Sequence, residues 1–319
     1  MNSAPLLSVR NLQTRYVLSR SRVVHALNGV TLDVQPGETL GVIGESGCGK
    51  STLARTVLRL VPAASGSVSL GEVDLLSLKG RALRRARRRM QVVFQDPMSS
   101  LNPRIRVGAS VREPLDIHRS DLDTGQRREL ATRILRRVGL SSDQERRFPH
   151  QLSGGQRQRV GIARALVLTP ELLIADEPVS SLDISIQVQI IGLLDSLRRE
   201  LGLAMIFISH DIRVVRFLSD RIAVMYMGRI VESATTDELF NRPLHPYSRE
   251  LFSAVPSLDP KARSRGDDRK SEVPSLLSLP KGCAFASRCP EASQTCLENS
   301  PALSEVSPGH RVACWRTAG

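Results

Sequence analysis

Hydrophobic and polar residues follow one another along this chain in patterns that predict an α/β fold. Residues 6–34 alternate apolar and polar positions, which is typical of strands in an antiparallel sheet. Short apolar runs in "ETLGVIGESG" at 38–47, "PELLIADEP" at 170–178 and "LAMIFISHD" at 203–211 indicate buried strands, and the last two end in acidic or histidine residues. Residues 104–150 carry leucine and arginine at helical spacing and predict a helical insertion.

The glycine turn after the first of these apolar runs predicts a phosphate-binding loop. Gly44, Gly49, Lys50 and Ser51 match G-x-x-x-x-G-K-S between a predicted strand and a predicted helix. Backbone N–H groups and the helix N-terminus would bind phosphate oxygens, with Lys50 at the β- and γ-phosphates and the Ser51 hydroxyl on Mg²⁺. The residues predicted to bind ATP are Gly44, Glu45, Ser46, Gly47, Cys48, Gly49, Lys50, Ser51 and Thr52.

An acidic pair completes the predicted metal site. The apolar strand in "LLIADEP" ends in Asp176 and Glu177, and strand alternation turns neighbouring side chains to different sides. One carboxylate can then serve Mg²⁺ while the other faces the attacking water. We assign Asp176 to the metal, and Glu177 to the role of general base for in-line attack on the γ-phosphate.

A second glycine turn, in "QLSGGQRQRV" at 151–160, offers a serine hydroxyl, backbone amides and a helix N-terminus to a phosphate but has no lysine. This stretch resembles the signature sequence of ABC-type ATPases. The motif order of that family's cassette is present across about residues 6–255. Its members here are Tyr16, Gly44 to Thr52, Gln95, Ser153 to Gln156, Asp176 with Glu177, "SSLD" at 180–183 and His210.

The resemblance implies a fold and a dimer. The fold is a P-loop NTPase ABC cassette over residues 1–255, with a mixed RecA-like core sheet, an N-terminal antiparallel β-subdomain and a helical subdomain at about 100–165. In this family the signature element binds the γ-phosphate of ATP held by a facing subunit, and a further residue bridges the subunits. The residues that match these roles are Ser153, Gly154, Gly155 and Gln156 for the signature and Asp183 for the bridge.

The resemblance also assigns roles to three residues that would otherwise attract little attention. Tyr16 resembles the aromatic residue that stacks on adenine, although a lone tyrosine on a strand is more often a packing residue. Gln95 resembles the glutamine that contacts Mg²⁺ and the attacking water. His210 resembles the histidine that touches the γ-phosphate and orients Glu177.

Two flanking segments narrow the resemblance to one kind of transporter. "QDPMSSLNPRIRVGASVREPL" at 95–115 and "NRPLHPYSRELFSAVPS" at 241–257 are similar to ATPase subunits of bacterial dipeptide and oligopeptide importers. The similarity implies a second ABC ATPase subunit, either a paralogue or an identical chain, two transmembrane permeases and an external peptide-binding protein that acts indirectly. It implies a peripheral location at the cytoplasmic face of the membrane. Nickel importers share this architecture and remain an alternative.

Four of the five cysteines lie in the last part of the chain, after a polar segment at 256–275 that we interpret as a linker. Their spacing in the region 276–319 is C-x5-C-x6-C-x17-C, and it suggests one site. A [4Fe-4S] cluster, which the resemblance includes in some members, is the preferred ligand; zinc, unliganded thiols and disulfides stay open. The cysteines concerned are Cys283, Cys289, Cys296 and Cys314.

Composition excludes some classes of function. The chain has 41% hydrophobic residues, as folded proteins do, and lacks an apolar run of about eighteen residues, so we expect no membrane span. Its start shows no signal-peptide pattern, which favours a cytoplasmic protein. The net charge of +13 indicates an anionic partner, but only 3% of residues are aromatic, which disfavours nucleic acid.

The arginine run has two interpretations, and two further functions are alternatives to a transport ATPase. "RALRRARRRM" at 81–90 holds six arginines at 81–89, which form either a solvated helix face or a contact with acidic lipid headgroups. A soluble ABC protein acting on ribosomes or nucleic acid is a distant alternative, because the chain has one cassette and no heptad run. A subunit that binds ATP without hydrolysing it is opposed by Glu177 and His210.

Overall fold

The chain folds into two compact units. The computed structural model describes residues 4–19, 22–96, 101–253 and 276–317, and the linker predicted at 256–275 lies outside them. Unit 1 comprises Met1–Val34, Thr39–Leu76 and Ile208–Gly319, and unit 2 comprises Gln35–Glu38 and Ser77–Phe207.

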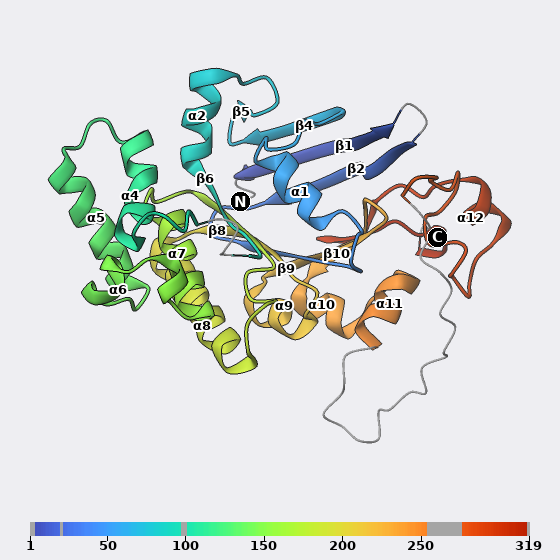
Figure 1. Cartoon of the computed structure of the whole chain (residues 1–319). Coiled ribbons are helices and arrows are strands. Elements are labelled where there is room, and N and C mark those ends of the chain that lie inside the picture. The colour runs from blue at the N-terminus through green and yellow to red at the C-terminus, as the bar shows by residue number, and fades with distance from the viewer. Residues whose placement is uncertain (1–3, 20–21, 97–100, 254–275, 318–319) are drawn as a thin grey trace. The chain divides into compact units, whose positions relative to one another are not determined.

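One sheet of unit 1 is antiparallel, as the alternation at 6–34 predicts. Its strand order is β2-β1-β4-β5, and β1 pairs with both β2 and β4 (Figure 1). Leu7 and Val9 of β1 are fully buried, because alternate side chains of a strand point to the same face. The strands are β1 (Leu7–Ser19), β2 (Arg22–Val34), β4 (Ser65–Leu70) and β5 (Val73–Asp74).

The second sheet within unit 1 is mixed. Its order is β11-β12-β10-β9-β3, in which β3 pairs parallel with β9 and the other neighbours pair antiparallel. Every residue of β3 is buried, which explains why its sequence does not alternate. The strands are β3 (Thr39–Ile43), β9 (Arg221–Tyr226), β10 (Arg229–Thr235), β11 (Ser304–Ser307) and β12 (His310–Val312).

The helices of unit 1 lie between and after these strands in the sequence. Figure 1 shows α11 in orange and α12 in red, in the C-terminal part of the chain. β11 and β12 join the last segment of the chain to β10, an attachment that the sequence did not predict. The helices are α1 (Lys50–Val57), α9 (Ile212–Leu218), α10 (Thr236–Asn241), α11 (Pro246–Ser253), α12 (Gln294–Glu298) and the 3-10 turn η3 (Trp315–Thr317).

Unit 2 holds three neighbouring strands and the predicted helical insertion. The strand order is β8-β7-β6, with β6 parallel to β7, and β7 and β8 are buried throughout, as their apolar runs predict. The strands are β6 (Met90–Val93), β7 (Leu172–Asp176) and β8 (Ala204–Ile208). The helices are α2 (Gly80–Arg89), α4 (Val107–His118), α5 (Thr124–Arg137), α6 (Ser142–Arg146), η1 (Pro149–Gln151), α7 (Gly154–Leu166) and α8 (Ile184–Leu201).

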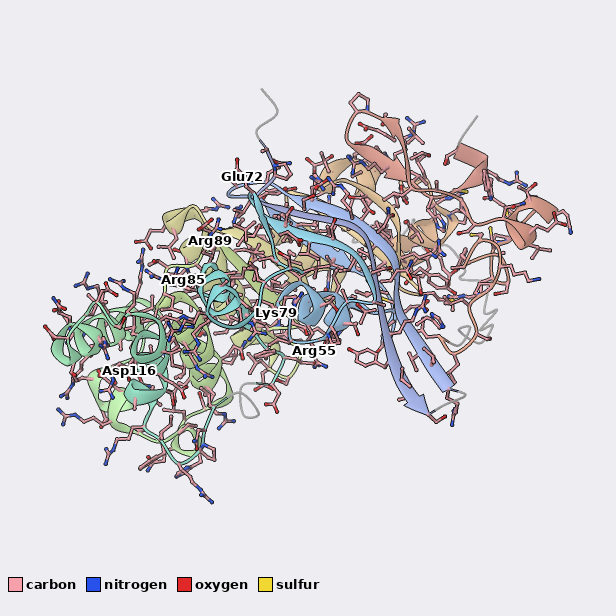
Figure 2. All side chains as sticks on the ribbon, turned by 90° about the horizontal axis from the view of Figure 1, so that it is seen from above. Arg55, Glu72, Lys79, Arg85, Arg89 and Asp116 are labelled. Carbon is pink, nitrogen blue, oxygen red and sulfur yellow. The ribbon has the colours of Figure 1, made fainter. Side chains whose placement is uncertain are left out.

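The arginine run forms α2. Figure 2 shows Arg85 and Arg89 on this helix, and Arg89 makes a two-pronged ion pair with Glu171, with Nε–Oε1 and Nη2–Oε2 distances of 2.6 and 2.7 Å. Arg81, Arg84 and Arg85 are exposed. Both interpretations of the run, a solvated face and a contact with acidic headgroups, are compatible with this exposure. Among the described residues, no helix combines the length and apolar composition that a membrane span requires.

Candidate nucleotide site

The phosphate-binding loop connects β3 to α1 in unit 1, as its glycine pattern predicts. Gly44 has a φ of +153°, and a Cβ at this position would lie 2.1 Å from the carbonyl oxygen of Met225. A Cβ at Gly49 would lie 2.4 Å from the carbonyl oxygen of Ala26. Only glycine therefore allows the loop to pass so close to the neighbouring backbone.

Lys50, the first residue of α1, is buried inside this loop and is only 5% exposed. Its Nζ donates hydrogen bonds to the carbonyl oxygens of Gly44, at 2.7 Å, and Glu45, at 2.9 Å. Burial raises the pKa of the neighbouring Cys48 thiol, although the charge of Lys50 opposes this effect. Cys48 is therefore a small neutral residue of the loop, and Lys50 supplies the positive charge.

The N-terminus of α1 points its peptide dipoles at the loop. Its cap residue is Gly49, and no side chain caps the helix there, so the first N–H groups can bind phosphate oxygens. Ser51 and Thr52 lie in the first turn. The hydroxyl of Tyr16, on β1, is 3.4 Å from the Thr52 hydroxyl, which brings the predicted adenine-stacking residue beside the loop. His210 is exposed after β8 and also belongs to unit 1.

The acidic pair lies at the end of β7 in unit 2. Asp176 is only 4% exposed, and Glu177 has a φ of 48°, a left-handed conformation that is uncommon for residues other than glycine. The Nε2 of Gln95 donates a hydrogen bond of 3.0 Å to Oε2 of Glu177. Unit 2 therefore brings together two of the three residues predicted to be catalytic, Gln95 and Glu177.

The signature turn caps α7 in unit 2. Ser153 Oγ accepts a hydrogen bond of 3.3 Å from the Gln156 N–H, and Gln156 Oε1 accepts one of 3.0 Å from the Ser153 N–H. A Cβ at Gly155 would lie 2.5 Å from Ile186 of α8, so glycine permits the close approach of α7 and α8. The Ser153 hydroxyl can still donate its proton, which suits a phosphate oxygen.

Asp183, the predicted bridge between subunits, is the exposed residue before α8. The next turn presents Ile184 and Val188, which are 80% and 65% exposed. Residues four apart lie on the same face of a helix, so the two side chains form a small apolar surface next to Asp183.

The sequence did not predict three residues near the phosphate-binding loop. Two of them, Tyr247 and Arg288, contact Glu45 of the loop, and the third, Glu250, contacts Arg288. The Tyr247 hydroxyl oxygen accepts a hydrogen bond of 2.9 Å from the Glu45 N–H. Arg288 donates to both carboxylate oxygens of Glu45, at 2.9 and 3.0 Å, and also to Glu250. Tyr247 and Glu250 had a signal, because both lie in the importer-like segment at 241–257. Arg288 is 243 residues from Glu45 and matches no pattern.

The predicted metal centre of the C-terminal region is not supported by the structure. Within the residues described, no group of three or more histidine, cysteine, aspartate or glutamate side chains is arranged to hold a metal ion. The described cysteines are all free, and burial raises the pKa of the Cys283 and Cys289 thiols. All four thiols of the predicted site nevertheless line one small cavity. They are Cys283, Cys289, Cys296 and Cys314.

Comparison with known proteins places this geometry in a family. The family model described as ABC transporter matches residues 27–180. A putative peptide import ATP-binding protein of Brucella ovis is 47% identical over 316 residues, which cover 99% of each chain. The chain belongs to the ABC transporter family. Within this family, the C-terminal region of oligopeptide/dipeptide transporters matches residues 231–296. The oligopeptide transport ATP-binding protein OppF of Salmonella typhimurium is 47% identical over 92% of this chain and 89% of its own.

Solved structures of ABC transporter cassettes confirm the predicted P-loop NTPase fold. A dimeric ATP-binding cassette in a post-hydrolysis state, bound to ADP and Pi, matches with a TM-score of 0.65 and 30% identity, over 72% of this chain and 98% of that one. CbiO1 of Clostridium perfringens, part of an ABC transporter complex, matches with a TM-score of 0.66 and 30% identity, over 75% of this chain and 92% of that one. The mixed sheet and the antiparallel sheet of the prediction are both present.

Proposed function

We propose that this chain is the ATP-hydrolysing subunit of an ABC importer of dipeptides or oligopeptides. The observation that carries the proposal is similarity along the whole chain to peptide import ATP-binding proteins, including the region beyond the cassette. ATP would close a dimer of two cassettes, and hydrolysis would open it. Because ATP then binds the closed dimer better than the open one, its binding and loss can drive the permeases.

The proposed roles at the nucleotide combine what the family resemblance implies with the chemistry of the side chains. Lys50 and the N–H groups of the loop from Gly44 to Thr52 bind the phosphates, and Tyr16 stacks on adenine. Ser51, Gln95 and Asp176 offer a hydroxyl, an amide oxygen and a carboxylate, which are oxygen ligands of the kind that Mg²⁺ prefers. Mg²⁺ bound with ATP supplies positive charge that offsets the charge of the phosphates.

Three residues act on the attacking water and the γ-phosphate. Glu177 accepts the proton of the water, and Gln95, which already donates a hydrogen bond to Glu177, holds the water in line. His210 contacts the γ-phosphate. Because the general base and its hydrogen-bonded glutamine are both present, the chain has the groups that hydrolysis requires and is not merely a nucleotide-binding subunit.

The second cassette completes the site. Ser153, Gly154, Gly155 and Gln156 would bind the γ-phosphate of ATP held by the facing subunit, and Asp183 would bridge the two chains. The apolar pair Ile184 and Val188 beside Asp183 supports a protein partner at this surface. The facing subunit is either a paralogue or a second copy of this chain.

The membrane partners would be two transmembrane permeases, with an extracytoplasmic peptide-binding protein acting through them. The chain would then lie at the cytoplasmic face of the cell membrane as a peripheral subunit, with no nucleic acid as partner. An importer of nickel or another solute built on the same subunits is the alternative, and it differs only in what the binding protein carries.

The decisive experiment is an ATPase assay on the assembled complex. The chain is co-expressed with its neighbouring operon products, the membrane complex is purified, and ATP hydrolysis is measured with the binding protein either empty, loaded with peptide or loaded with Ni²⁺. We expect peptide to raise the rate. Stimulation by Ni²⁺ alone would establish the alternative importer, and a chain that ignores the permeases and co-purifies with nucleic acid would overturn transport.

Replacing Tyr16 with alanine should weaken ATP binding because the stacking platform for adenine is lost. The loss is about 5- to 150-fold in affinity, the range measured for one base stacked on one aromatic side chain. Tyr16→Phe keeps the ring and loses only the long contact of the hydroxyl with Thr52, so its affinity should match that of the wild type. Titration with a fluorescent ATP analogue measures both. Equal affinity in the alanine variant would assign Tyr16 to packing alone.

The division of the chain is part of the same proposal: a cassette at 1–255 with a helical subdomain at about 100–165, a linker at 256–275, and a cysteine-rich region at 276–319. We further propose that this region binds a [4Fe-4S] cluster, with zinc as the alternative, since all four thiols line one cavity. Anaerobic purification, visible absorption and metal analysis test this. A chain that contains neither iron nor zinc would leave four structural thiols.

A further inference from the structure

Arg288, in the C-terminal region, reaches the phosphate-binding loop from the far end of the sequence. Its Nη1 donates to both carboxylate oxygens of Glu45, at 2.9 and 3.0 Å, and its Nη2 donates to Glu250 of α11 at 2.5 Å. The Arg288 side chain is only 10% exposed, whereas that of Glu45 is 28% exposed. The pair is therefore largely withdrawn from water, where charges interact more strongly than at a surface.

Aromatic rings hold the Arg288 guanidinium in place. Its central carbon lies 5.4 Å from the ring centre of Phe285 and 5.8 Å from that of Tyr226. Tyr226, Tyr247 and Phe285 pack on one another with centroid distances of 4.6 to 5.5 Å, and each is 1% exposed. Partial burial lowers the pKa of Arg288, but hydrogen bonds and charge from Glu45 outweigh it, so the guanidinium stays charged.

Glu45 is held at three points, and two of them come from outside the cassette motifs. The Tyr247 hydroxyl accepts from its N–H at 2.9 Å, and Arg288 binds its carboxylate. The third point is its carbonyl oxygen, which accepts from Nζ of Lys50 at 2.9 Å. The residue that Arg288 fixes is thus hydrogen-bonded directly to the lysine assigned to the phosphates.

The charge of Glu45 gives this contact a function. A carboxylate in a loop that binds a triphosphate repels the ligand, and the repulsion is strong where water is partly excluded. Arg288 offsets that negative charge and keeps the carboxylate turned to the C-terminal region. The two effects, charge neutralisation and a fixed loop, both favour bound nucleotide over free nucleotide.

We propose that Arg288 is a positioning residue of the nucleotide site, through which the C-terminal region sets the affinity of the phosphate-binding loop for ATP. The inference rests on the proposed function only in taking this loop as the ATP site. It gives the C-terminal region a task that is separate from binding a metal.

Arg288→Ala should raise both the Kd for ATP and KM at least about tenfold, while kcat at saturating ATP stays within about threefold of the wild type. Arg288→Lys keeps the charge but has one nitrogen, so it cannot bind Glu45 and Glu250 with separate nitrogens as Nη1 and Nη2 of Arg288 do, and its Kd should lie between those of the wild type and Arg288→Ala. The matched control is Arg249→Ala. Arg249 lies on α11 and its side chain is 47% exposed; its ion pair, at 2.9 Å, is with Glu291 rather than Glu45, so the Kd of Arg249→Ala should match that of the wild type.

The double variant Arg288→Ala/Glu45→Gln separates positioning from general damage. Removing the uncompensated carboxylate should recover part of the affinity that Arg288→Ala loses, and a merely structural defect would not be rescued in this way. The full chain is titrated with a fluorescent ATP analogue, and circular dichroism checks folding. Wild-type affinity in Arg288→Ala, or a double variant that binds ATP no more tightly than Arg288→Ala, would overturn the proposal.

The result of this experiment does not depend on whether the chain is part of a peptide importer. Nucleotide affinity is measured on the chain itself, whereas the importer assignment is tested by peptide stimulation of the assembled complex. A chain that binds ATP through Arg288 but ignores peptide would keep the inference and lose the importer. Peptide stimulation with an unaltered Kd in Arg288→Ala would do the reverse.

Discussion

Glu177→Gln should lower kcat for ATP hydrolysis by about 100- to 10,000-fold, the range for loss of a general base, while ATP still binds. An amide has nearly the shape of a carboxylate but cannot take a proton from the attacking water. Gln95 can keep its hydrogen bond, because the oxygen of the new amide still accepts from Nε2. The substitution therefore removes the proton acceptor and leaves the surroundings of the strand end unchanged.

Two measurements on the assembled complex separate the chemical step from binding. Single-turnover hydrolysis gives the rate of the chemical step, and titration with a fluorescent ATP analogue gives Kd. Glu171→Gln is the matched control, since the same chemical change is made just before β7 at a residue that pairs with Arg89 on the surface. If Glu177→Gln kept more than about a tenth of the wild-type rate, another group would have to accept the proton.

Local pattern was enough to predict the parts of the site that are continuous in sequence. The loop from Gly44 to Thr52 needs glycine at Gly44 and Gly49, where a Cβ would lie 2.1 and 2.4 Å from neighbouring backbone atoms. This steric requirement produces a short motif that is recognisable in the sequence. Likewise β7 and β8 are buried throughout, so their sequences are uninterrupted apolar runs. These features depend mainly on residues close in sequence, so local backbone geometry and burial are enough to predict them.

The contacts of the C-terminal region could not be predicted in this way. Arg288 and Glu45 are 243 residues apart, and the residues next to them in sequence form no pattern that predicts their ion pair. Strands β11 and β12 are too short for alternation to be recognised, and their position beside β10 depends on strand pairing between residues far apart in sequence, such as Glu232 and Val312. The number and spacing of the four cysteines predict one centre, but spacing along the chain does not fix the direction of a side chain, and no metal-holding group is found among the described residues.

A buried polar cluster around His310 of β12 contributes to the attachment of this region to the rest of unit 1. Its Nε2 lies 2.8 Å from Oε1 of Glu232, and its Nδ1 lies 3.0 Å from Oε1 of Glu238. Both ring nitrogens therefore lie within hydrogen-bonding distance of carboxylate oxygens. His310 is 1% exposed and Glu232 is 0% exposed, so the pair is shielded from water. Glu232 also accepts backbone hydrogen bonds from Leu244 and His245.

His310→Leu should lower the stability of the C-terminal region by about 1–3 kcal/mol, because it leaves the buried Glu232 side chain without the hydrogen-bond partner that the His310 ring provides. Trp315, the one tryptophan of the chain, lies three residues beyond β12, and its fluorescence during urea unfolding reports this region directly. Adding Glu232→Gln should restore part of the loss, since the buried charge is then gone.

Arg133→Ala provides the control for this prediction, because it breaks an ion pair whose partners are 69% and 73% exposed and should cost less than about 1 kcal/mol. An equal loss in both variants would mean that burial of the His310 cluster does not stabilise the attachment. If His310→Leu lowers stability more than Arg133→Ala does and also weakens ATP binding, the attachment through β12 is needed to keep Arg288 in place on Glu45. The C-terminal region would then contribute to the nucleotide site through two linked contacts, one that fixes the region and one that fixes the loop.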